Sequence, residues 1–352
     1  MTSKVAVIRF DADNGISLKH GLDLIGGIDD LNSRKRSVAV KVGIFDTEGF
    51  HTSVPVVSSI VHCFDKAPNI FIAESDNYRG TGSERLQVWK ELFSDRVVPF
   101  NLSEDSDTMR VRVADEEVGL SHILFKPNVL VSTHVLRVYE KGSILKNLLG
   151  LVPDSKKARF HKKLAPALAD MFEAVGGIDL AVMDGTYFWR GLGYLPVQTN
   201  IILVGRDAVA VETVGGLLAS MNLQKMPVLQ EFVRRGLGEG DLKNIEIVGA
   251  SFESLQKEFD VAIKVHKKRK LRSEGPTTWS GRVHRGFKSL MQEGFFKLPN
   301  KRTVQDVVKA LEAKSIPARG KEEKIEGFLA RRVKNGILKK TENKNEQIYW
   351  TN

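Results

Sequence analysis

The residues best suited to chemistry are histidines, lysines and asparagines that recur through the middle of the chain. We expect these to bind a ligand: Lys126, Asn128, Thr133, His134, Lys146, Asn147, Gly150 and His161, with Lys162 or Lys163 beside the last histidine. Cations that converge with amide groups suit an anionic ligand such as a carboxylate or a phosphate. We therefore predict a small anion as the ligand, with His134 and Lys146 as catalytic residues.

Acidic side chains add a second kind of chemistry. The candidates are Glu74, Asp76, Asp184, Asp207 and Glu212, and we also expect Asp207 and Gly185 to contact the ligand. Glu74 and Asp76 are candidate ligands of a divalent metal ion, and Asp184 is a candidate catalytic carboxylate or metal ligand beside Gly185. With His134 as acid or base near neutral pH, such a site would support proton transfer or hydrolysis. In the alternative reading Asp184 and Gly185 form a turn after a strand, Asp207 is a helix N-cap, and the loop around Asp76 only caps a helix.

Several common site types are absent from the sequence. It has no Gly-rich phosphate loop of standard spacing, no Gly-x-Ser-x-Gly and no His-Glu-x-x-His. Its single cysteine, Cys63, can form neither an internal disulfide nor an iron–sulfur cluster bound by four thiolates. We therefore expect no iron–sulfur cofactor and a reducing, cytoplasmic location. No apolar run is long enough for a membrane span, so no membrane partner is expected.

Strand-like and helix-like segments alternate over the first 260 residues. The predicted strands are 5–9, 38–44, 70–73, 129–132, 178–183, 200–204 and 245–248, and the predicted helices are a run capped by Ser53 and residues 83–93, 164–175, 207–221 and 227–235. This alternation predicts an α/β fold, with a parallel or mixed sheet covered by helices on both faces. Ligands of such sheets lie beyond the carboxyl ends of the strands.

Charge divides the chain into a mildly acidic body and a basic C-terminal part. Residues 261–352 hold 23 Lys and Arg against 9 Asp and Glu, a net charge of +14, whereas the first 260 residues hold 30 against 34, a net charge of −4. We predict an α/β domain over 1–260, a basic linker over 261–300 and a small domain over 301–352. A basic appendage on an acidic body indicates a polyanionic partner, and a basic tail that only aids solubility is the alternative.

The last 50 or so residues have the pattern of two helices and a hairpin. Thr303 and Asp306 predict a helix start, two amphipathic segments follow, and 337–340 and 347–350 flank a polar turn. This order resembles a winged-helix domain, which implies binding of DNA or RNA, with a protein partner or a homodimer as the alternatives. The cations expected to contact nucleic acid are Lys267, Lys268, Arg269, Lys270, Arg331, Arg332, Lys334, Lys339 and Lys340.

Taken in order, the polar motifs of the body resemble those of the domain-of-unknown-function 362 family over about residues 35–250. The matching motifs are Lys126-Pro127-Asn128, Thr133-His134, Lys146-Asn147-Leu148-Leu149-Gly150, His161, Asp184-Gly185 and Asp207-Ala208-Val209-Ala210. This chain has Ser132 where members often have Lys, and it lacks the cysteine-rich segment of many members. The resemblance implies no agreed reaction, and an electron-transfer role does not carry over.

Two functions follow as expectations. The first is a body that binds a small anion, with or without a metal ion, coupled to a winged helix that binds nucleic acid. The second is an enzyme acting on an anionic metabolite, whose winged helix serves dimerisation or partner docking.

Overall fold

The computed structural model describes residues 2–12, 15–45, 47, 49–191, 195–268, 279–314, 316–334, 336–343 and 346–351. The chain forms two compact units, Met1–Lys270 and Leu271–Asn352, called here the body and the C-terminal unit. No helix of the described residues is long and apolar enough to cross a membrane.

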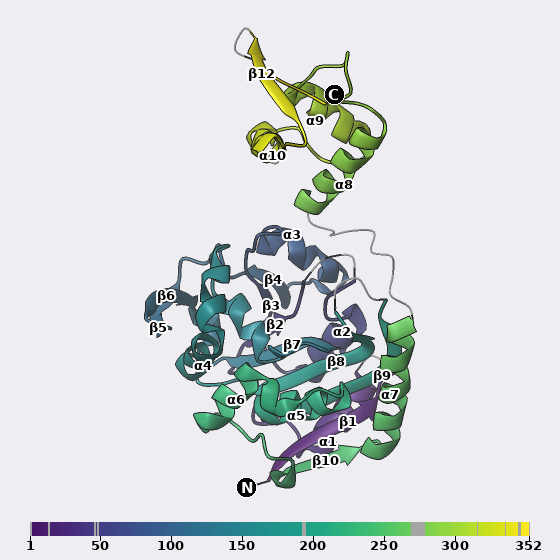
Figure 1. The fold of residues 1–352 in the computed structure, drawn as a ribbon. Helices are drawn as coiled ribbons and strands as arrows, with labels where there is room; N and C mark the ends of the chain where they lie inside the picture. Colours follow the sequence, from purple (N-terminus) through teal and green to yellow (C-terminus); the bar gives the residue numbers. More distant parts are fainter. Residues whose placement is uncertain are drawn as a thin grey trace. The chain divides into compact units, whose positions relative to one another are not determined.

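The body is built on a mixed eight-stranded sheet (Figure 1). Its order is β10-β1-β9-β8-β7-β2-β3-β4, and the strands are β1 (Ser3–Arg9), β2 (Val38–Val42), β3 (Ile70–Glu74), β4 (Val97–Asn101), β7 (Val129–Arg137), β8 (Leu180–Trp189), β9 (Val197–Gly205) and β10 (Ile245–Gly249). Only β9 runs antiparallel to both of its neighbours, and the other pairs are parallel. All seven predicted strands are present, and the α/β prediction is confirmed.

Helices cover both faces of this sheet, as predicted. They are α1 (Ile16–Leu24), α2 (Val54–Cys63), α3 (Gly82–Leu86), α4 (Leu164–Ala174), α5 (Ala208–Leu218), α6 (Pro227–Arg234) and α7 (Phe252–Lys268). Apolar side chains of α1 and α2 form one core with Val38, Val40 and Val42, and α4 to α7 form the other core with Ala39. Alternate residues of β2 therefore face opposite cores, which places Lys41 on the side of α4.

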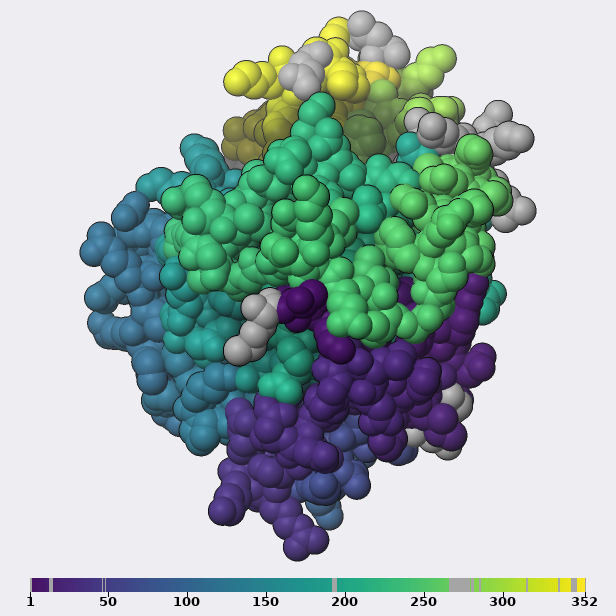
Figure 2. All heavy atoms as spheres, turned by 90° about the horizontal axis from the view of Figure 1, so that it is seen from below, coloured from purple at the N-terminus to yellow at the C-terminus, as the bar shows by residue number. Residues whose placement is uncertain are grey.

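The two ends of the body's chain meet at one edge of the sheet. Strand β1 pairs in parallel with β10, so that Val5 lies opposite Ile247. Figure 2 shows the purple N-terminal residues against green residues of the body's last elements. Helix α7 then runs through the predicted boundary at residue 260, because apolar side chains such as Phe259 and Ala262 continue to pack on the α5 side of the sheet.

Among the described residues of the body, five α-helices and β-strands were not predicted: β4, β5 (Thr108–Val113), β6 (Glu116–Ser121), α1 and α7. The edge strand β4 contains Pro99, and prolines are tolerated at sheet edges. Strands β5 and β6 form a separate, highly charged hairpin whose turn places Ala114 and Asp115 at positive φ. Helix α1 was missed altogether. The predicted helix 83–93 is α3 followed by a 3-10 helix, η1 (Gln87–Leu92).

The C-terminal unit contains three helices and a three-stranded antiparallel sheet. They are α8 (Trp279–Gln292), β11 (Arg302–Thr303), α9 (Val304–Ala313), α10 (Glu322–Lys334), β12 (Lys339–Asn343) and β13 (Glu346–Trp350), with the sheet order β11-β13-β12. The capping box predicted at Thr303 and Asp306 is present. The segment 261–300 was predicted as a linker with a short helix over 283–291; it holds the end of α7 and a longer helix over those residues, α8. Helix α8 packs through Val283, Phe287 and Leu290 into the core of this unit.

Candidate functional site

A cavity of about 530 Å³ opens at the carboxyl ends of β2, β3 and β7. We call it the cationic pocket. Its lining is Lys41, Ile44, Phe45, Phe50, Glu74, Asn77, Tyr78, Arg85, His134, Arg137, Val138, Tyr139, Lys146, Asn147, Leu149, Gly150, Ser155, Lys157, Ala158, His161 and Gly191. Two 3-10 helices, η3 (Lys146–Leu151) and η4 (Lys157–Lys163), supply much of that lining.

The topology of the sheet explains this location. Strands β2 and β7 are neighbours, but the chain continues from β2 through α2 toward β3 on one side and from β7 through α4 toward β8 on the other. Helices α2 and α4 pack into opposite cores. The loops beyond the two strands therefore diverge, and a crevice at such a switch point is the usual ligand site of open α/β sheets.

A buried ion pair occupies the floor of the pocket. Lys41 Nζ lies 2.9 Å from Glu74 Oε2 and donates a hydrogen bond of 3.0 Å to Asn147 Oδ1. Asn147 Nδ2 donates to the carbonyl oxygens of Lys41, at 2.8 Å, and Thr133, at 3.2 Å. One asparagine thereby links η3 to β2 and β7.

The charge state of this pair follows from its surroundings. Burial favours the neutral form of Glu74, but Lys41, Arg85 and Lys157 outweigh it and hold the pKa of Glu74 below its ordinary value. Burial also lowers the pKa of Lys41, although Glu74 opposes the shift. Glu74 is thus an ionised carboxylate shared among several cations.

Two glycines allow these groups to approach one another. A Cβ on Gly150 would lie 2.5 Å from Lys41 Nζ and 3.0 Å from Glu74 Oε1. A Cβ on Gly43, just after β2, would lie 2.3 Å from His134 Cδ2. Gly150 therefore leaves room for the ion pair, and Gly43 leaves room for the imidazole.

Cations outnumber carboxylates in the pocket lining. Five cationic side chains, Lys41, Arg85, Arg137, Lys146 and Lys157, line it with the single carboxylate Glu74. Arg85 donates to the carbonyl oxygens of Ser75 and Ile44, and Arg137 donates to that of Gly142. The Nε atoms of both arginines are buried with no hydrogen-bond partner in the described chain. Buried donors are normally paired, whereas each of these arginines has one buried N–H donor without a partner in the described chain.

Burial and, for the lysines, mutual repulsion lower the pKa values of three of these cations. Burial, reinforced by Arg137 and neighbouring lysines, lowers the pKa of Lys146 to about 7. Burial lowers the pKa of Lys157 to about 8 although Glu74 opposes it, and the pKa of Arg137 to about 10. A bound anion would reverse these shifts, because an opposite charge favours the protonated amine.

Both histidines of the pocket are neutral at pH 7. Burial lowers the pKa of His134 well below its ordinary value, and Arg137 and Lys41 add to the shift. Burial and Lys146 also lower the pKa of His161, which is exposed at the end of η4. Each neutral imidazole can therefore accept a hydrogen bond from a bound ligand, but the lowered pKa makes it a weaker base than an ordinary histidine.

Aromatic side chains form part of the pocket wall. The Phe50 ring lies 4.6 Å from that of Trp189 and 6.5 Å from that of His134. The Arg137 guanidinium stacks 4.7 Å from the Tyr139 ring, and Phe45 and Tyr78 also line the cavity. The pocket thus joins a cationic floor to an apolar wall.

A carboxylate outside the pocket fixes the segment that leads into η3. The oxygens of Glu212, on α5, accept hydrogen bonds of 2.8 and 3.0 Å from the backbone N–H groups of Ser143 and Leu145. Burial raises the pKa of Glu212, while these N–H groups and Arg137 oppose the rise. The predicted acid therefore positions the backbone just before Lys146.

The structure brings together part of the predicted ligand set. His134, Lys146, Asn147, Gly150, His161 and Glu74 line the pocket. Thr133 and His134 lie within β7 rather than after it, because β7 pairs with β8 as far as Arg137 and its register places His134 opposite Met183. Successive side chains of a strand point to opposite faces, so Thr133 does not line the pocket.

The remaining predicted residues lie elsewhere. Lys126 and Asn128 precede β7 at the amino ends of the parallel strands, where Lys126 pairs with Asp179. Asp207 follows the antiparallel β9 and caps α5 through the N–H groups of Val209 and Ala210. These three do not line the pocket because their strands place them at the opposite end of the sheet.

Asp184 and Gly185 lie inside β8 and outside the pocket lining. Asp184 accepts hydrogen bonds from the backbone N–H of Ser53, at 2.7 Å, and from both the N–H and the hydroxyl of Thr186. Ser53 is at the N-cap of α2, but its side chain makes no cap hydrogen bond. The structure thus gives Asp184 a role in joining β8 to the start of α2.

The predicted metal ligands already have hydrogen-bond partners. Asp76 Oδ1 accepts from Gly82 N and Asn101 Nδ2, and Glu74 accepts from Lys41 and Ser75 N. Among the described residues no three His, Cys, Asp or Glu side chains are grouped as ligands of one ion. A divalent metal ion remains a prediction.

Sequence reasoning missed Lys41, Arg85, Arg137 and Lys157. Lys41 carried a signal, since it is the only polar residue in the five-residue strand β2. A lysine inside such a run is buried only when it is paired. Arg85 and Lys157 carried no comparable signal, because helices and loops commonly present cations to solvent.

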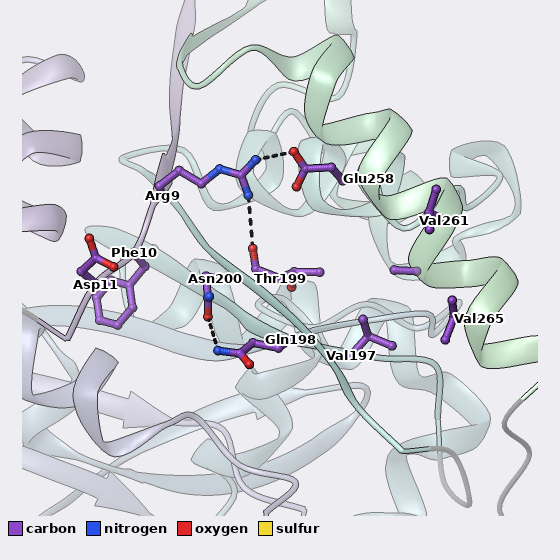
Figure 3. A pocket seen from close by; sticks show the side chains of 11 residues that line it. Arg9, Phe10, Asp11, Val197, Gln198, Thr199, Asn200, Glu258, Val261 and Val265 are labelled. Atoms are coloured by element: carbon purple, nitrogen blue, oxygen red, sulfur yellow. Dashed lines mark hydrogen bonds and ion pairs between the residues drawn. The ribbon is translucent and has the colours of Figure 1, made fainter.

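Two other pockets of the body have little unpaired charge. The first, of about 470 Å³, lies between β9 and α7 and is shown in Figure 3, where Arg9 is bound to Glu258 and to the Thr199 carbonyl oxygen. In the second, of about 700 Å³, Lys163 pairs with Asp115 and Arg235 pairs with Asp170. Their cations are already neutralised by the chain.

The predicted nucleic-acid contacts fall into two groups. Arg331, Arg332 and Lys334 form the last turn of α10, and Lys339 and Lys340 begin β12. Arg332 is half-buried over the Phe328 ring at 3.4 Å and contacts His284, whereas Arg331, Lys334 and Lys340 are exposed. Lys267 and Lys268 end α7, and Arg269 and Lys270 lie outside the described residues.

Comparison with protein families identifies one match. The model of the family described as domain of unknown function (DUF362) matches residues 38–216, from the start of β2 to α5. Comparison with curated proteins and with solved structures gives no match. The matched region is just over half of the chain and contains most of the pocket-lining segments, β2, β3, β7, η3 and η4, so the chain belongs to the DUF362 family.

Proposed function

We propose that the body binds a small organic anion in the cationic pocket. The observation that carries this proposal is the excess of positive charge in the pocket, whose lining holds five cationic side chains and one carboxylate. An anion there would supply acceptors to Arg85 and Arg137 and restore protonation of Lys146. The volume of the cationic pocket, about 530 Å³, is suited to a small metabolite rather than to a polymer.

The ligand chemistry that fits best is a carboxylate or phosphate attached to an apolar group. The anionic part would pair with Arg137 and Lys157, and the apolar part would lie against Phe50 and Tyr139. A planar guanidinium favours bidentate pairing with either anion, so the lining alone does not choose between them.

A ligand screen tests this proposal. Thermal unfolding is followed with a panel of aryl and alkyl carboxylates and phosphates, for the intact protein and for Arg137→Gln. We expect at least one anion to raise the midpoint of the intact protein by several degrees and that of Arg137→Gln by much less. Lys163→Gln, in another pocket, serves as the control. Equal responses of all three proteins would contradict the proposal.

We further propose that the C-terminal unit binds nucleic acid. Residues 271–352 hold 18 Lys and Arg against 9 Asp and Glu, a net charge of +9, and exposed cations gather at the end of α10 and the start of β12. The order of helices followed by a hairpin is that expected of a winged helix, in which a helix enters the major groove and the hairpin contacts the backbone. Salt-dependent binding of a DNA duplex by the full chain is the test.

An enzymatic role on an anionic metabolite is the second candidate for the body. It is favoured by neutral imidazoles and an amine of lowered pKa in the same cavity. Turnover of a bound anion that is lost in His134→Gln would support this role.

A further inference from the structure

Lys146 differs from the other two lysines of the cationic pocket in its surroundings. Lys41 donates to Glu74 and Asn147, and Lys157 donates to Ser75. The amine of Lys146 lines the same cavity, yet no hydrogen bond or ion pair joins it to any residue in the described part of the chain. Lys146 is therefore the lysine of this pocket whose nitrogen is available to a ligand.

The position of Lys146 is also fixed by the fold. It is the first residue of η3, and its neighbour Asn147 bonds to β2 and β7. The preceding backbone is held by Glu212. An amine on a backbone anchored at both sides can be presented reproducibly to a bound molecule.

The protonation state of the amine suits nucleophilic chemistry. Burial and the surrounding cations lower the pKa of Lys146 to about 7, so a large fraction of the amine is neutral before a ligand binds. A bound anion favours the protonated form, and the neutral fraction that remains in the complex grows as the pH rises. Only the neutral amine has the lone pair needed to attack a carbonyl carbon, and lysines are activated in this way by burial and by nearby cations.

We propose that Lys146 forms an imine with an anionic aldehyde or ketone bound in the cationic pocket. The inference rests on the proposed function, since Arg137 and Lys157 must hold the anionic group of the same molecule. The aromatic wall favours a compound with an apolar side chain, for which an aryl 2-oxo acid is the simplest example.

The step balances without any other reactant. Lys146 Nζ bonds to the carbonyl carbon, and a proton passes from nitrogen to the carbonyl oxygen to give a carbinolamine. The carbon–oxygen bond then breaks, the second proton of the nitrogen leaves with the hydroxyl group as water, and a carbon–nitrogen double bond forms. Nothing is oxidised or reduced in this sequence.

Reductive trapping tests the proposal on the full-length protein. The protein is incubated with phenylpyruvate and sodium cyanoborohydride, and the site of the adduct is mapped by mass spectrometry of a digest. We expect one saturable adduct on Lys146 that is suppressed by phenylacetate, an anion of similar shape without a ketone. Lys146→Arg, which retains the charge, should lower the total adduct at least tenfold.

The matched control is Lys141→Arg, which changes a lysine five positions away that does not line the pocket. It should be labelled like the unchanged protein. Adducts spread over surface lysines and equal in both variants would overturn the proposal.

The outcomes separate this inference from the proposed function. If phenylacetate binds in an Arg137-dependent manner but phenylpyruvate is not trapped on Lys146, the imine proposal is wrong and anion binding stands. If neither compound binds and no anion of the screening panel binds in an Arg137-dependent manner, both proposals are contradicted.

Discussion

Lys41 Nζ lies 2.9 Å from Glu74 Oε2, and this buried pair joins the carboxyl ends of the two parallel strands β2 and β3. Arg85 lies 3.6 Å from the other carboxylate oxygen of Glu74. One carboxylate is thus shared by two cations at the floor of the pocket, and Arg137, Lys146 and Lys157 add further positive charge without another carboxylate in the lining. The carboxylate of Glu74 therefore does not neutralise the positive charge of the side chains that line the pocket.

Lys41→Met should strongly destabilise the protein, because it leaves Glu74 buried without its nearest cation. We expect a loss of about 3–5 kcal/mol in the free energy of unfolding, measured by urea denaturation. Lys19→Met removes an exposed lysine that pairs with Asp23 on the surface of α1 and should have little effect. If the free energy of unfolding falls by a similar amount in the two variants, burial does not make the Lys41–Glu74 pair more stabilising than an exposed pair.

Stability should increase with pH because of Lys146. The pKa of Lys146 is about 7 in the folded chain against 10.5 for an ordinary lysine, so the unfolded chain binds more protons between these values. The contribution of this residue therefore opposes folding most below pH 7 and fades as the pH rises toward 10.5. Lys146→Met should raise the free energy of unfolding more at acidic than at alkaline pH, as measured by urea denaturation. An equal effect at both ends of the range would contradict the lowered pKa.

Anion affinity should show the opposite trend with pH. Protonated Lys146 and Lys157 attract the ligand, and each loses its charge as the pH passes its pKa, about 7 and about 8 respectively. Binding of a ligand found in the screen should weaken steadily over this range when followed by calorimetry. An affinity that does not change across it would show that neither amine contacts the anion.

Glu212→Gln should weaken anion binding although Glu212 does not line the pocket. The change removes a carboxylate oxygen that accepts backbone hydrogen bonds before Lys146, at an expected cost of about 1–3 kcal/mol in stability. Urea denaturation and ligand affinity are measured together. Glu246→Gln alters an exposed ion pair with Lys4 and should leave both unchanged.

Replacement of Arg331, Lys334 and Lys340 by alanine should reduce nucleic-acid binding by the full chain. Each phosphate contact that is lost should lower the slope of log affinity against log salt by about 0.9 on duplex DNA. Fluorescence anisotropy across a salt series measures both quantities. Lys309→Ala, which removes one exposed charge from α9, serves as the control. An unchanged slope in the triple variant would place the interface elsewhere.

The sequence was a good guide to the sheet and a partial guide to the pocket. Buried β-branched runs marked the seven predicted strands, but β7 and β8 extend beyond those runs because backbone pairing continues through polar residues such as His134 and Asp184. The order of the strands cannot be obtained from alternation of apolar residues alone. That order places Lys41 beside His134 and Lys146, and it places Lys126 and Asp207 at the opposite end of the sheet.

The family motifs predicted some residues that line the pocket but did not predict what those residues do there. Asn147 and Gly150 line the pocket, but their main structural contribution is to accommodate and bind the Lys41–Glu74 pair. Lys41 itself lay outside the motif set, because a lysine in a strand carries no motif until its partner on the next strand is known.

The most direct test of the account is calorimetric titration of a ligand identified by the screen into the intact protein, Arg137→Gln and Lys163→Gln. We expect one site per chain and an affinity at least tenfold weaker in Arg137→Gln, a loss of about 1.4 kcal/mol or more in binding free energy. The affinity of Lys163→Gln should be unchanged. Equal affinities in all three proteins would contradict the assignment of the cationic pocket as the anion-binding site.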